Sequence, residues 1–320
     1  MTLSYLLRLF CLLTIAAGLV DAAAQAILFC AARPILRRLH AAAPRRQERL
    51  LYLVQIAPAL LALLVAAALC LPEYLIHEPA RAAEPVGSVT LLLAASLCAW
   101  FGASFLRGLR TVIRTIRFAR TCRKTGRIVH HVRGTPLLAH PDPIPPLCLV
   151  GFFRPFIVIS RKLLEPGTLN PGALNAALEH ERAHIHQFDN WKMLFLCFLP
   201  TLPRDPWRAP WQLAADWAAD DDAACGDPVR SLLLADALVR TARLVTSSRS
   251  EVICAALTRA ESSLAMRVDR LIHPRSASRA NATPLLYGLT SVVLLAVSAA
   301  VAVSPWIYSA SEHILHLGGF

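Results

Sequence analysis

The stretch from Leu174 to Asn190, LNAALEHERAHIHQFDN, contains the motif H-E-x-x-H at His180, Glu181 and His184. Two histidines four residues apart lie one helical turn apart and about 40° around the axis, so both imidazoles point the same way. That arrangement suits two ligands of a tetrahedral zinc ion, and it turns Glu181 toward a metal-bound water rather than toward the metal. The motif therefore predicts a zinc site, provided that the stretch is helical.

Local signals favour a helix here. Asn170 suits the N-cap, Pro171 suits the first helical position, and the segment is rich in alanine. The alternative is an exposed helix with two surface histidines. Because H-E-x-x-H arises by chance in roughly one chain in a hundred of this composition, a third ligand has to be found. His186 falls on another face of the helix and is predicted to be a structural or surface residue.

The composition indicates a membrane protein. Of the 320 residues, 56% are hydrophobic and 17% are charged, which is too apolar for an ordinary soluble domain. The net charge of +12 points first to the cytoplasmic side of a bilayer. The nine cysteines are scattered without a C-x-x-C pair, so neither a disulfide framework nor a cysteine zinc site is indicated.

Three apolar stretches predict membrane spans before the motif, at about 9–32, 51–71 and 86–106. A secretory signal peptide is the alternative for the first stretch, but apolar residues continue past the would-be cleavage site and six arginines follow it. Asp21 lies within the first span, where a carboxylate is costly unless it is paired or near water. It is either a functional residue or a residue at the mouth of the helix.

A fourth span is predicted at 284–304, followed by a short external tail at 305–320. Arginines between the first two spans, and again after residue 107, place these loops in the cytoplasm and both termini outside. The working domain is then the cytoplasmic loop 107–283. Its first arginines form a helical stripe, for which we expect contact with anionic lipid headgroups rather than with nucleic acid.

Inside this loop, a proline-rich linker at 141–146 precedes two runs of strand length, 147–150 and 156–159. The run after Arg154 is expected to offer a backbone edge to an extended peptide. Four tryptophans crowd the region after the motif, where they indicate either a membrane-facing surface or plain core packing. They are Trp191, Trp207, Trp211 and Trp217.

A third ligand is expected from residues 211–224, WQLAADWAADDDAA. The segment is helix-forming, and Asp216 and Asp220 lie one turn apart on one face. A solvated acidic face is the alternative, but the segment is otherwise rich in Ala and Trp and follows the motif closely. A carboxylate from a following helix completes a His-His-carboxylate site with one position left for water.

Several features together resemble family M56, the antibiotic-sensor-type integral membrane metallopeptidases, which are distant relatives of the M48 membrane proteases. The resemblance covers most of the chain and is far more specific than the five-residue motif alone. It includes three spans before the site and one after it, Gly151-Phe-Phe-Arg154-Pro155 with the apolar strand that follows, the motif helix with Asp189, Ala219-Asp220-x-x-Ala223, and Gly226-Asp227-Pro228.

The resemblance implies a third ligand from the family pattern E-x-x-A-D-x-x-A. Aligned on Ala219, Asp220 and Ala223, the Glu of that pattern falls on Asp216, so this chain departs from the family. Asp reaches about one methylene less far than Glu, and a metal site tolerates errors of only about 0.2 Å. A shifted register places Gln212 at the ligand position, which we disfavour because a neutral amide is a poor zinc ligand.

On this alignment His180, His184 and Asp216 hold Zn²⁺, which activates a water molecule and polarises the scissile carbonyl. Glu181 takes the proton of the water and passes it to the leaving amine. Asp220 accepts the outer N–H of a histidine ligand and fixes its tautomer.

The sequence thus predicts a mainly α-helical integral membrane protein of four transmembrane helices with a cytoplasmic α+β, gluzincin-like metallopeptidase domain between spans 3 and 4. We expect a zinc metalloendopeptidase of the cell membrane, in bacteria the inner membrane. Its substrate is a protein, by resemblance a helix-turn-helix repressor or another regulator. Its other partners are membrane lipids, with no direct nucleic acid. Because only residues 305–320 follow the last span, we expect no β-lactam sensor.

Three alternatives stay open at this point. The first is a pseudo-protease that signals or scaffolds by contact, for which Asp216 in place of Glu is the main support. The second is a quality-control protease of the M48 kind, which the span arrangement disfavours. The third is a nucleic-acid binder that uses the arginine stripe, and salt-dependent DNA binding by residues 107–283 would support it.

Overall fold

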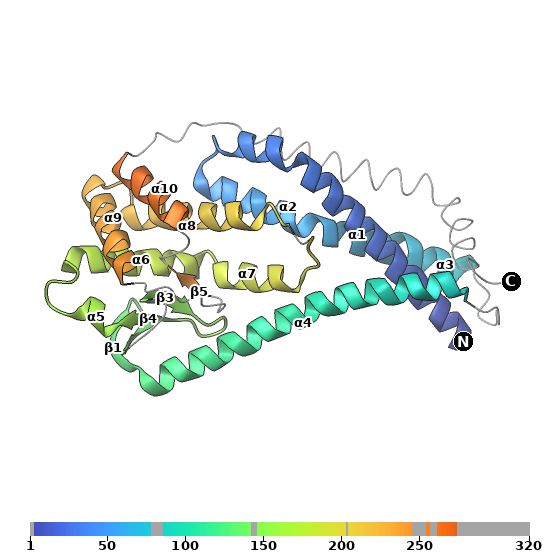
Figure 1. Cartoon of the computed structure of the whole chain (residues 1–320), viewed down its shortest axis with the longest axis horizontal. Coiled ribbons are helices and arrows are strands. Elements are labelled where there is room, and N and C mark those ends of the chain that lie inside the picture. The colour runs from blue at the N-terminus through green and yellow to red at the C-terminus, as the bar shows by residue number, and fades with distance from the viewer. Residues whose placement is uncertain are drawn as a thin grey trace.

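The computed structural model describes residues 3–77, 86–141, 146–202, 204–244, 254–256 and 261–273. Within these residues the protein is mainly helical, with one small sheet at the end opposite the N-terminus (Figure 1). The expected fourth span, 284–304, and the tail, 305–320, lie outside the described residues. Most of the expected linker, 142–145, does so as well.

Three helices are long and apolar enough to cross a membrane, which is compatible with a membrane protein. The first is α1 (Leu3–Leu39). The second joins α2 (Pro44–Val65) to α3 (Leu71–His77) through a π-helical turn, η1 (Ala66–Cys70). The third is α4 (Ser88–Thr125). The first two extend beyond the expected spans at both ends, and α4 does so at its C-terminal end. The arginine stripe forms the second half of α4 rather than a separate helix.

The sheet contains five strands in the order β1-β2-β4-β3-β5. β2 and β4 are parallel, and the other neighbours are antiparallel. The strands are β1 (Arg127–Val132), β2 (Thr135–His140), β3 (Leu147–Val150), β4 (Phe156–Ser160) and β5 (Cys254–Ala256). The two expected strands, β3 and β4, are thereby confirmed as an antiparallel pair.

The position of β4 contradicts one expectation. The sequence predicts a free backbone edge on the strand after Arg154. In the structure this strand, β4, lies between β2 and β3, and both of its edges are paired. Every residue of β3 and β4 is buried, because both faces of the sheet are covered. A peptide that adds to this sheet as a strand must therefore use an outer strand.

Five helices lie between β4 and β5 in the sequence, and a sixth follows β5. They are α5 (Arg161–Leu164), α6 (Pro171–His186), α7 (Asp189–Phe198), α8 (Arg208–Ala224), α9 (Pro228–Arg243) and α10 (Glu261–Ile272). Apolar residues of α6, α9 and α10 form the main core against one face of the sheet, and α4 covers the other face with Phe118, Ala119 and Cys122.

The motif helix α6 begins as the sequence predicts. The side chain of Asn170 accepts a hydrogen bond from the amide of Gly172 at 2.8 Å, and Pro171 occupies the first turn. At the other end, Phe188 adopts a left-handed conformation with φ of 57°. This residue turns the chain sharply from α6 into α7, so that Asp189 lies close to the last turn of α6.

A second apolar core joins the long helices to α7 and α8. Leu50, Leu51 and Val54 of α2 lie in it together with Trp207 and Trp211. Both tryptophans are buried, so core packing, rather than a membrane-facing surface, explains these two residues.

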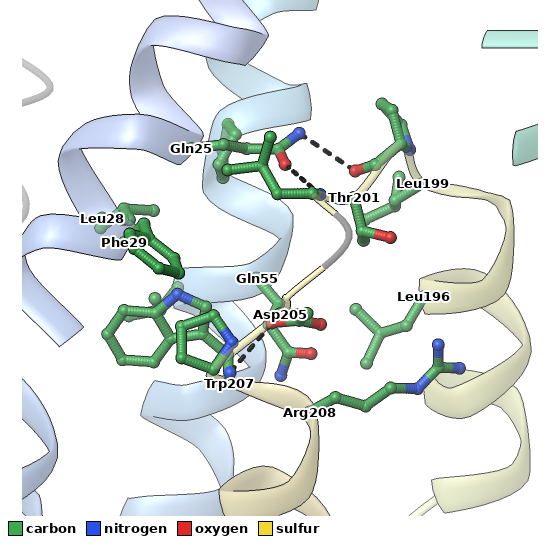
Figure 2. Close-up of a pocket in the computed structure, with 15 residues that line it drawn as sticks. Gln25, Leu28, Phe29, Gln55, Leu196, Leu199, Thr201, Asp205, Trp207 and Arg208 are labelled. Carbon is green, nitrogen blue, oxygen red and sulfur yellow. Dashed lines mark hydrogen bonds between the residues drawn. The ribbon is translucent and has the colours of Figure 1, made fainter. Parts of the chain in front are cut away.

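A pocket lies beside this core, between α1, α2 and the loop from α7 to α8 (Figure 2). Gln25 of α1 reaches across it, donating to the carbonyl of Pro200 at 3.1 Å and accepting from the amide of Leu202 at 3.1 Å. Gln25 also donates to Oδ2 of Asp21 at 2.7 Å, so one oxygen of the carboxylate within the first long helix is hydrogen-bonded. These contacts tie α1 to the loop that leads into α8.

Candidate metal centre

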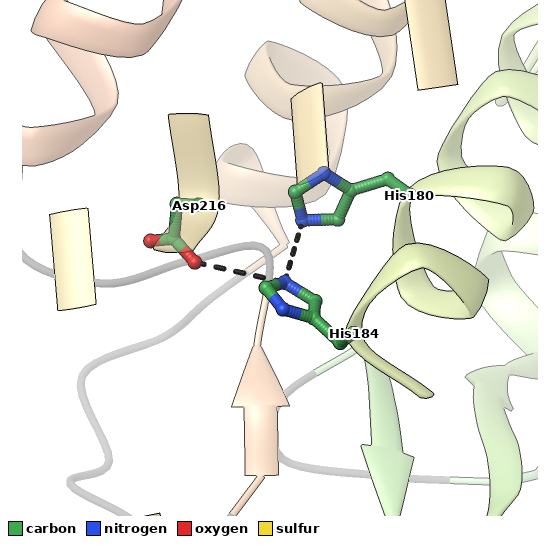
Figure 3. Close-up of side chains that lie close together, drawn as sticks. All are labelled: His180, His184 and Asp216. Carbon is green, nitrogen blue, oxygen red and sulfur yellow. Dashed lines mark hydrogen bonds and ion pairs between the residues drawn. The ribbon is translucent and has the colours of Figure 1, made fainter. Parts of the chain in front are cut away.

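His180 and His184 extend from the same side of α6. Their Nε2 atoms lie 3.2 Å apart, and their rings are almost perpendicular, with centroids 4.8 Å apart. Both side chains are essentially inaccessible to solvent. Figure 3 shows the two rings leaving one helix, with Asp216 reaching toward them from α8.

Asp216 is the third member of this buried group. Its Oδ1 lies 3.7 Å from Nε2 of His184, and one donor atom from each of the three residues lies within 4.8 Å of the others. Donors bound to a tetrahedral zinc at about 2.0–2.2 Å stand roughly 3.3–3.6 Å apart. The measured separations of 3.2 and 3.7 Å bracket that range, so the group could bind a metal ion.

The other nitrogen of each histidine faces a carboxylate. Nδ1 of His184 lies 2.7 Å from Oδ2 of Asp189. Nδ1 of His180 lies 2.9 Å from Oδ1 of Asp220, within ion-pair distance, although the angle falls outside ideal hydrogen-bond geometry. A carboxylate on Nδ1 favours a proton there and leaves the lone pair on Nε2. Both Nε2 atoms are thus presented to the same point as acceptors, which suits a shared cation.

The electrostatics differ between the two histidines. Burial, reinforced by the charge of Arg267, lowers the pKa of His180 to about 4 despite the opposing effect of Asp220. Burial would also lower the pKa of His184, but its hydrogen bond to Asp189 and the charge of that carboxylate outweigh burial and raise it. His180 is therefore neutral at pH 7, as a ligand must be. The raised pKa of His184 makes protons compete more strongly with a metal for this residue, so metal binding should weaken as pH falls.

Glu181 is completely buried, and neither of its carboxylate oxygens has a hydrogen-bond partner of good geometry among the described residues. Burial raises the pKa of this carboxyl to about 7, and the charge of His184 and the nearby backbone amide of Leu149 only partly oppose the shift. A carboxyl poised near neutrality can take up and release a proton at physiological pH. An unsatisfied buried carboxylate is costly, so its position calls for a functional explanation.

Arg267 of α10 enters the site, although sequence reasoning did not single it out. It is 1% exposed and donates to both oxygens of Asp220, at 2.7 and 2.9 Å. Its Nη2 lies 3.3 Å from Nε2 of His180, and its Nη1 lies 3.8 Å from Asp216. The charge of Arg267 lowers the pKa of Asp220 against the effect of burial, which keeps that carboxylate ionised.

Among the described residues, buried carboxyl groups outnumber the cations around the two histidines. Within the described part of the chain, two cations contact the carboxylates of this region: the buried Arg267 and the partly exposed Lys192. The buried carboxylates are Glu48, Glu181, Asp189, Asp216 and Asp220. Because uncompensated buried charge is unfavourable, a divalent cation on the two Nε2 atoms and Asp216 would stabilise this arrangement. The donor set and the charge balance both fit a divalent metal ion.

Two other candidate residues lie away from this group. Gln212, the alternative third ligand, points its amide toward the sulfur of Met193 at 3.6 Å, so the register that uses Asp216 fits the structure better. His186 is exposed and lies 3.1 Å from Arg182, which agrees with its expected surface position.

The signal that could have identified Arg267 is its place on an amphipathic helix. Leu264, Val268 and Leu271 of α10 pack against the main core, and Arg267 lies on that same face. An arginine on an apolar stripe requires a buried partner. The partner of Arg267, Asp220, could not be named from the sequence because 47 residues separate the two.

The site is closed in this structure. His180, Glu181, His184, Asp216 and Asp220 are each at most 3% exposed. β5 is paired with β3 beside α6 and α7, so the outer edge of β3 next to Glu181 is occupied by the protein's own chain. A polymeric substrate can reach the group only if one of the covering segments moves.

No family model matches the chain, and neither the curated proteins nor the solved structures include a match. The geometry of the buried group therefore has to support any functional conclusion by itself, together with the resemblance of the sequence motifs.

Proposed function

We propose that the protein is a membrane-bound zinc metalloendopeptidase of the M56 type. The observation that carries the proposal is the arrangement of the two histidines. Their Nε2 atoms converge at 3.2 Å while each Nδ1 faces a carboxylate, and Asp216 lies 3.7 Å from one of them. Glu181, between the histidines in the sequence, is the buried carboxyl that such chemistry needs.

In this proposal His180, His184 and Asp216 hold zinc, which supplies a Lewis acid that polarises a peptide carbonyl and activates water at neutral pH. Glu181 accepts a proton from the attacking water and returns it to the leaving amine. Asp189 and Asp220 keep the two histidines in the tautomer that exposes Nε2. Arg267 holds Asp220 in place through two hydrogen bonds and is a positioning residue.

Asp216 serves as a ligand despite its short side chain because of where α8 lies. The carboxylate is buried, and its Oδ1 already stands at a ligand-to-ligand distance from His184. Close packing between α6 and α8 explains how an Asp reaches: the two helices contact each other, and small residues of both, Ala177 and Ala223, share the main core.

The proposed setting is the cytoplasmic side of a cell membrane. The arginines at the junction of α1 and α2, and those in the second half of α4, support this topology. The substrate is then a cytoplasmic or membrane-proximal protein, by resemblance a transcriptional repressor in a signalling pathway. The four-span arrangement and the gluzincin-like domain are part of the same proposal.

One observation favours a second candidate, a pseudo-protease that acts as a signalling scaffold. Nη2 of Arg267 lies 3.3 Å from Nε2 of His180, where a guanidinium can satisfy that lone pair without a metal. In this alternative Arg267 occupies the place of the metal, and the protein signals by contact rather than by cleavage. Arg267 makes its two short hydrogen bonds with Asp220 and stays 3.8 Å from Asp216, too far to occupy that carboxylate, and for that reason we favour the enzyme.

The test compares Glu181→Gln with the wild type in cells and after purification. New protein N-termini are mapped in cells that express either form, and the metal content of both detergent-purified proteins is measured. The enzyme predicts equal metal content, with cleavage products that appear only with the wild type. If both forms hold metal and no N-terminus depends on Glu181, the scaffold is favoured instead.

A further inference from the structure

A continuous chain of polar contacts runs from the second long helix to the metal centre. Oε1 of Glu48, on α2, accepts a hydrogen bond from Nζ of Lys192 at 2.8 Å. The same Nζ donates to Oδ1 of Asp189 at 3.2 Å, and Oδ2 of Asp189 lies 2.7 Å from Nδ1 of His184. Three elements, α2, α7 and α6, are thus linked through four polar side chains.

The start of this chain is tightly held. The side chain of Glu48 is 4% exposed, and its Oε1 also accepts from the indole N–H of Trp211 at 3.1 Å. The apolar neighbours of Glu48 on α2, including Leu51, pack against α7 and α8. A carboxylate buried in such surroundings is retained at a cost in solvation, and a partner must compensate it. Here the compensating partner is the lysine that also holds Asp189.

A second bridge runs in parallel at the first turn of α2. Arg45 forms an ion pair with Asp222 of α8, and Asp222 accepts from the side-chain amide of Gln187 at 3.0 Å. Gln187 is the C-cap residue of α6. The first two turns of α2 therefore contact the C-terminal end of the motif helix by two routes, of which only the route through Glu48 reaches a metal-binding nitrogen.

We infer that Glu48 is a positioning residue of the metal centre, acting through Lys192 and Asp189 on His184. Lys192 holds Asp189 from the side opposite to His184, so the direction of the Asp189 carboxylate depends on where Glu48 holds the lysine. A shift of α2 relative to α7 would change the orientation of His184 and hence metal affinity. The inference rests on the proposed metal site but not on peptidase activity.

The competing explanation is that Glu48 only anchors α2 to α7 and α8. The two explanations differ in one respect. An anchor affects the stability of the whole domain, and its loss would add to the loss of Asp189. A positioning residue acts on the metal only through Asp189, so its loss has no further effect once Asp189 has been replaced.

The test measures the affinity of full-length, detergent-purified protein for Zn²⁺ by competition with a chromophoric chelator. Five proteins are compared: wild type, Glu48→Gln, Asp189→Asn, the double variant, and Asp236→Asn as a control. Asp236 pairs with Arg240 at the surface of α9, and its replacement removes one negative charge without affecting the contacts that link Glu48 to His184. Lys192→Met, alone and together with Asp189→Asn, extends the set to seven and repeats the comparison in case Glu48→Gln does not fold.

Loss of a group that touches a metal ligand typically weakens binding about 10–100-fold, so we expect that range for Asp189→Asn and about 3–10-fold for the more distant Glu48→Gln. The double variant should bind as Asp189→Asn does, and Asp236→Asn as the wild type. The inference is overturned if Glu48→Gln and Lys192→Met leave affinity unchanged, or if they weaken it equally with and without Asp189. If the wild type binds no zinc, the proposed metal site fails, and the inference falls with it.

Discussion

Replacing Arg267 by methionine is expected to destabilise the protein far more than the same replacement at Arg270. The two arginines leave the same helix, α10, and each forms a bidentate pair with one of two neighbouring residues of α8. Arg267 donates to both oxygens of Asp220 at 2.7 and 2.9 Å, and Arg270 donates to both oxygens of Asp221 at 2.7 and 2.8 Å. The two pairs differ in burial. The side chains of Arg267 and Asp220 are each 1% exposed, whereas those of Arg270 and Asp221 are 21% and 45% exposed.

The expected magnitudes follow from that difference. Without Arg267, Asp220 becomes an uncompensated charge in the interior, a loss that typically costs about 3–5 kcal/mol. An exposed ion pair contributes about 0–1 kcal/mol. For a cooperative unit of roughly 150–250 residues, each kcal/mol corresponds to about 2–4 °C. Arg267→Met should therefore lower Tm by roughly 6–20 °C, and Arg270→Met by less than about 4 °C.

The assay is thermal unfolding of the chelator-treated protein in detergent, followed by tryptophan fluorescence, so that bound metal does not compensate for the lost charge. The double variant Arg267→Met/Asp220→Asn should recover part of the loss, because replacing both partners leaves no buried charge. Equal shifts for the two single variants would refute the argument from burial. So would a double variant less stable than Arg267→Met alone.

Further predictions concern the acid–base residue, the pH dependence and the packing of α4. Glu181→Gln should keep zinc affinity within about threefold of the wild type but reduce peptide cleavage at least about 100-fold, in parallel chelator-competition and N-terminus assays. The pKa of Glu181 is raised from 4.5 to about 7 in the metal-free fold, so its contribution favours folding most at low pH and is lost as pH rises through 7. In denaturant titrations, the free energy of unfolding of chelator-treated wild type should fall by about 2–3 kcal/mol between pH 4.5 and 7 relative to that of Glu181→Gln. The same pH dependence of unfolding free energy in both proteins would contradict this. Gly108→Ala places a Cβ 2.5 Å from the ring of Phe198 and should lower the free energy of unfolding by about 1–3 kcal/mol. Gly102→Ala, on the same helix, meets no atom within 4 Å and should be neutral or stabilising by up to about 1 kcal/mol. Thermal unfolding of the two variants measures both effects.

Local signals in the sequence sufficed for the motif helix and for the two buried strands. Asn170 and Pro171 define the start of α6, and the apolar runs of β3 and β4 are continuous because both faces of the sheet are covered. Strands β1 and β2 were not predicted. β1 is basic and almost wholly exposed, with only Val132 buried, so it lacks the alternating pattern that identifies a half-buried strand.

More of the candidate metal-binding group than of its surroundings could be predicted from the sequence. His180 and His184 follow from helical spacing, and Asp216 follows from the family pattern. The residues that orient them come from distant parts of the chain: Arg267 contacts Asp220 across 47 residues, and Glu48 contacts Lys192 across 144. No local pattern specifies such pairs, because they depend on how whole helices pack.

The most direct test of the metal centre is the zinc content of the detergent-purified protein, with wild type compared to His180→Ala and Asp216→Ala. A site of three protein ligands predicts about one zinc per chain in the wild type and loss of the metal in both variants. Metal-free wild type would contradict the metal centre and favour the arginine-filled scaffold. Zinc that persists in Asp216→Ala would show that the third ligand lies elsewhere.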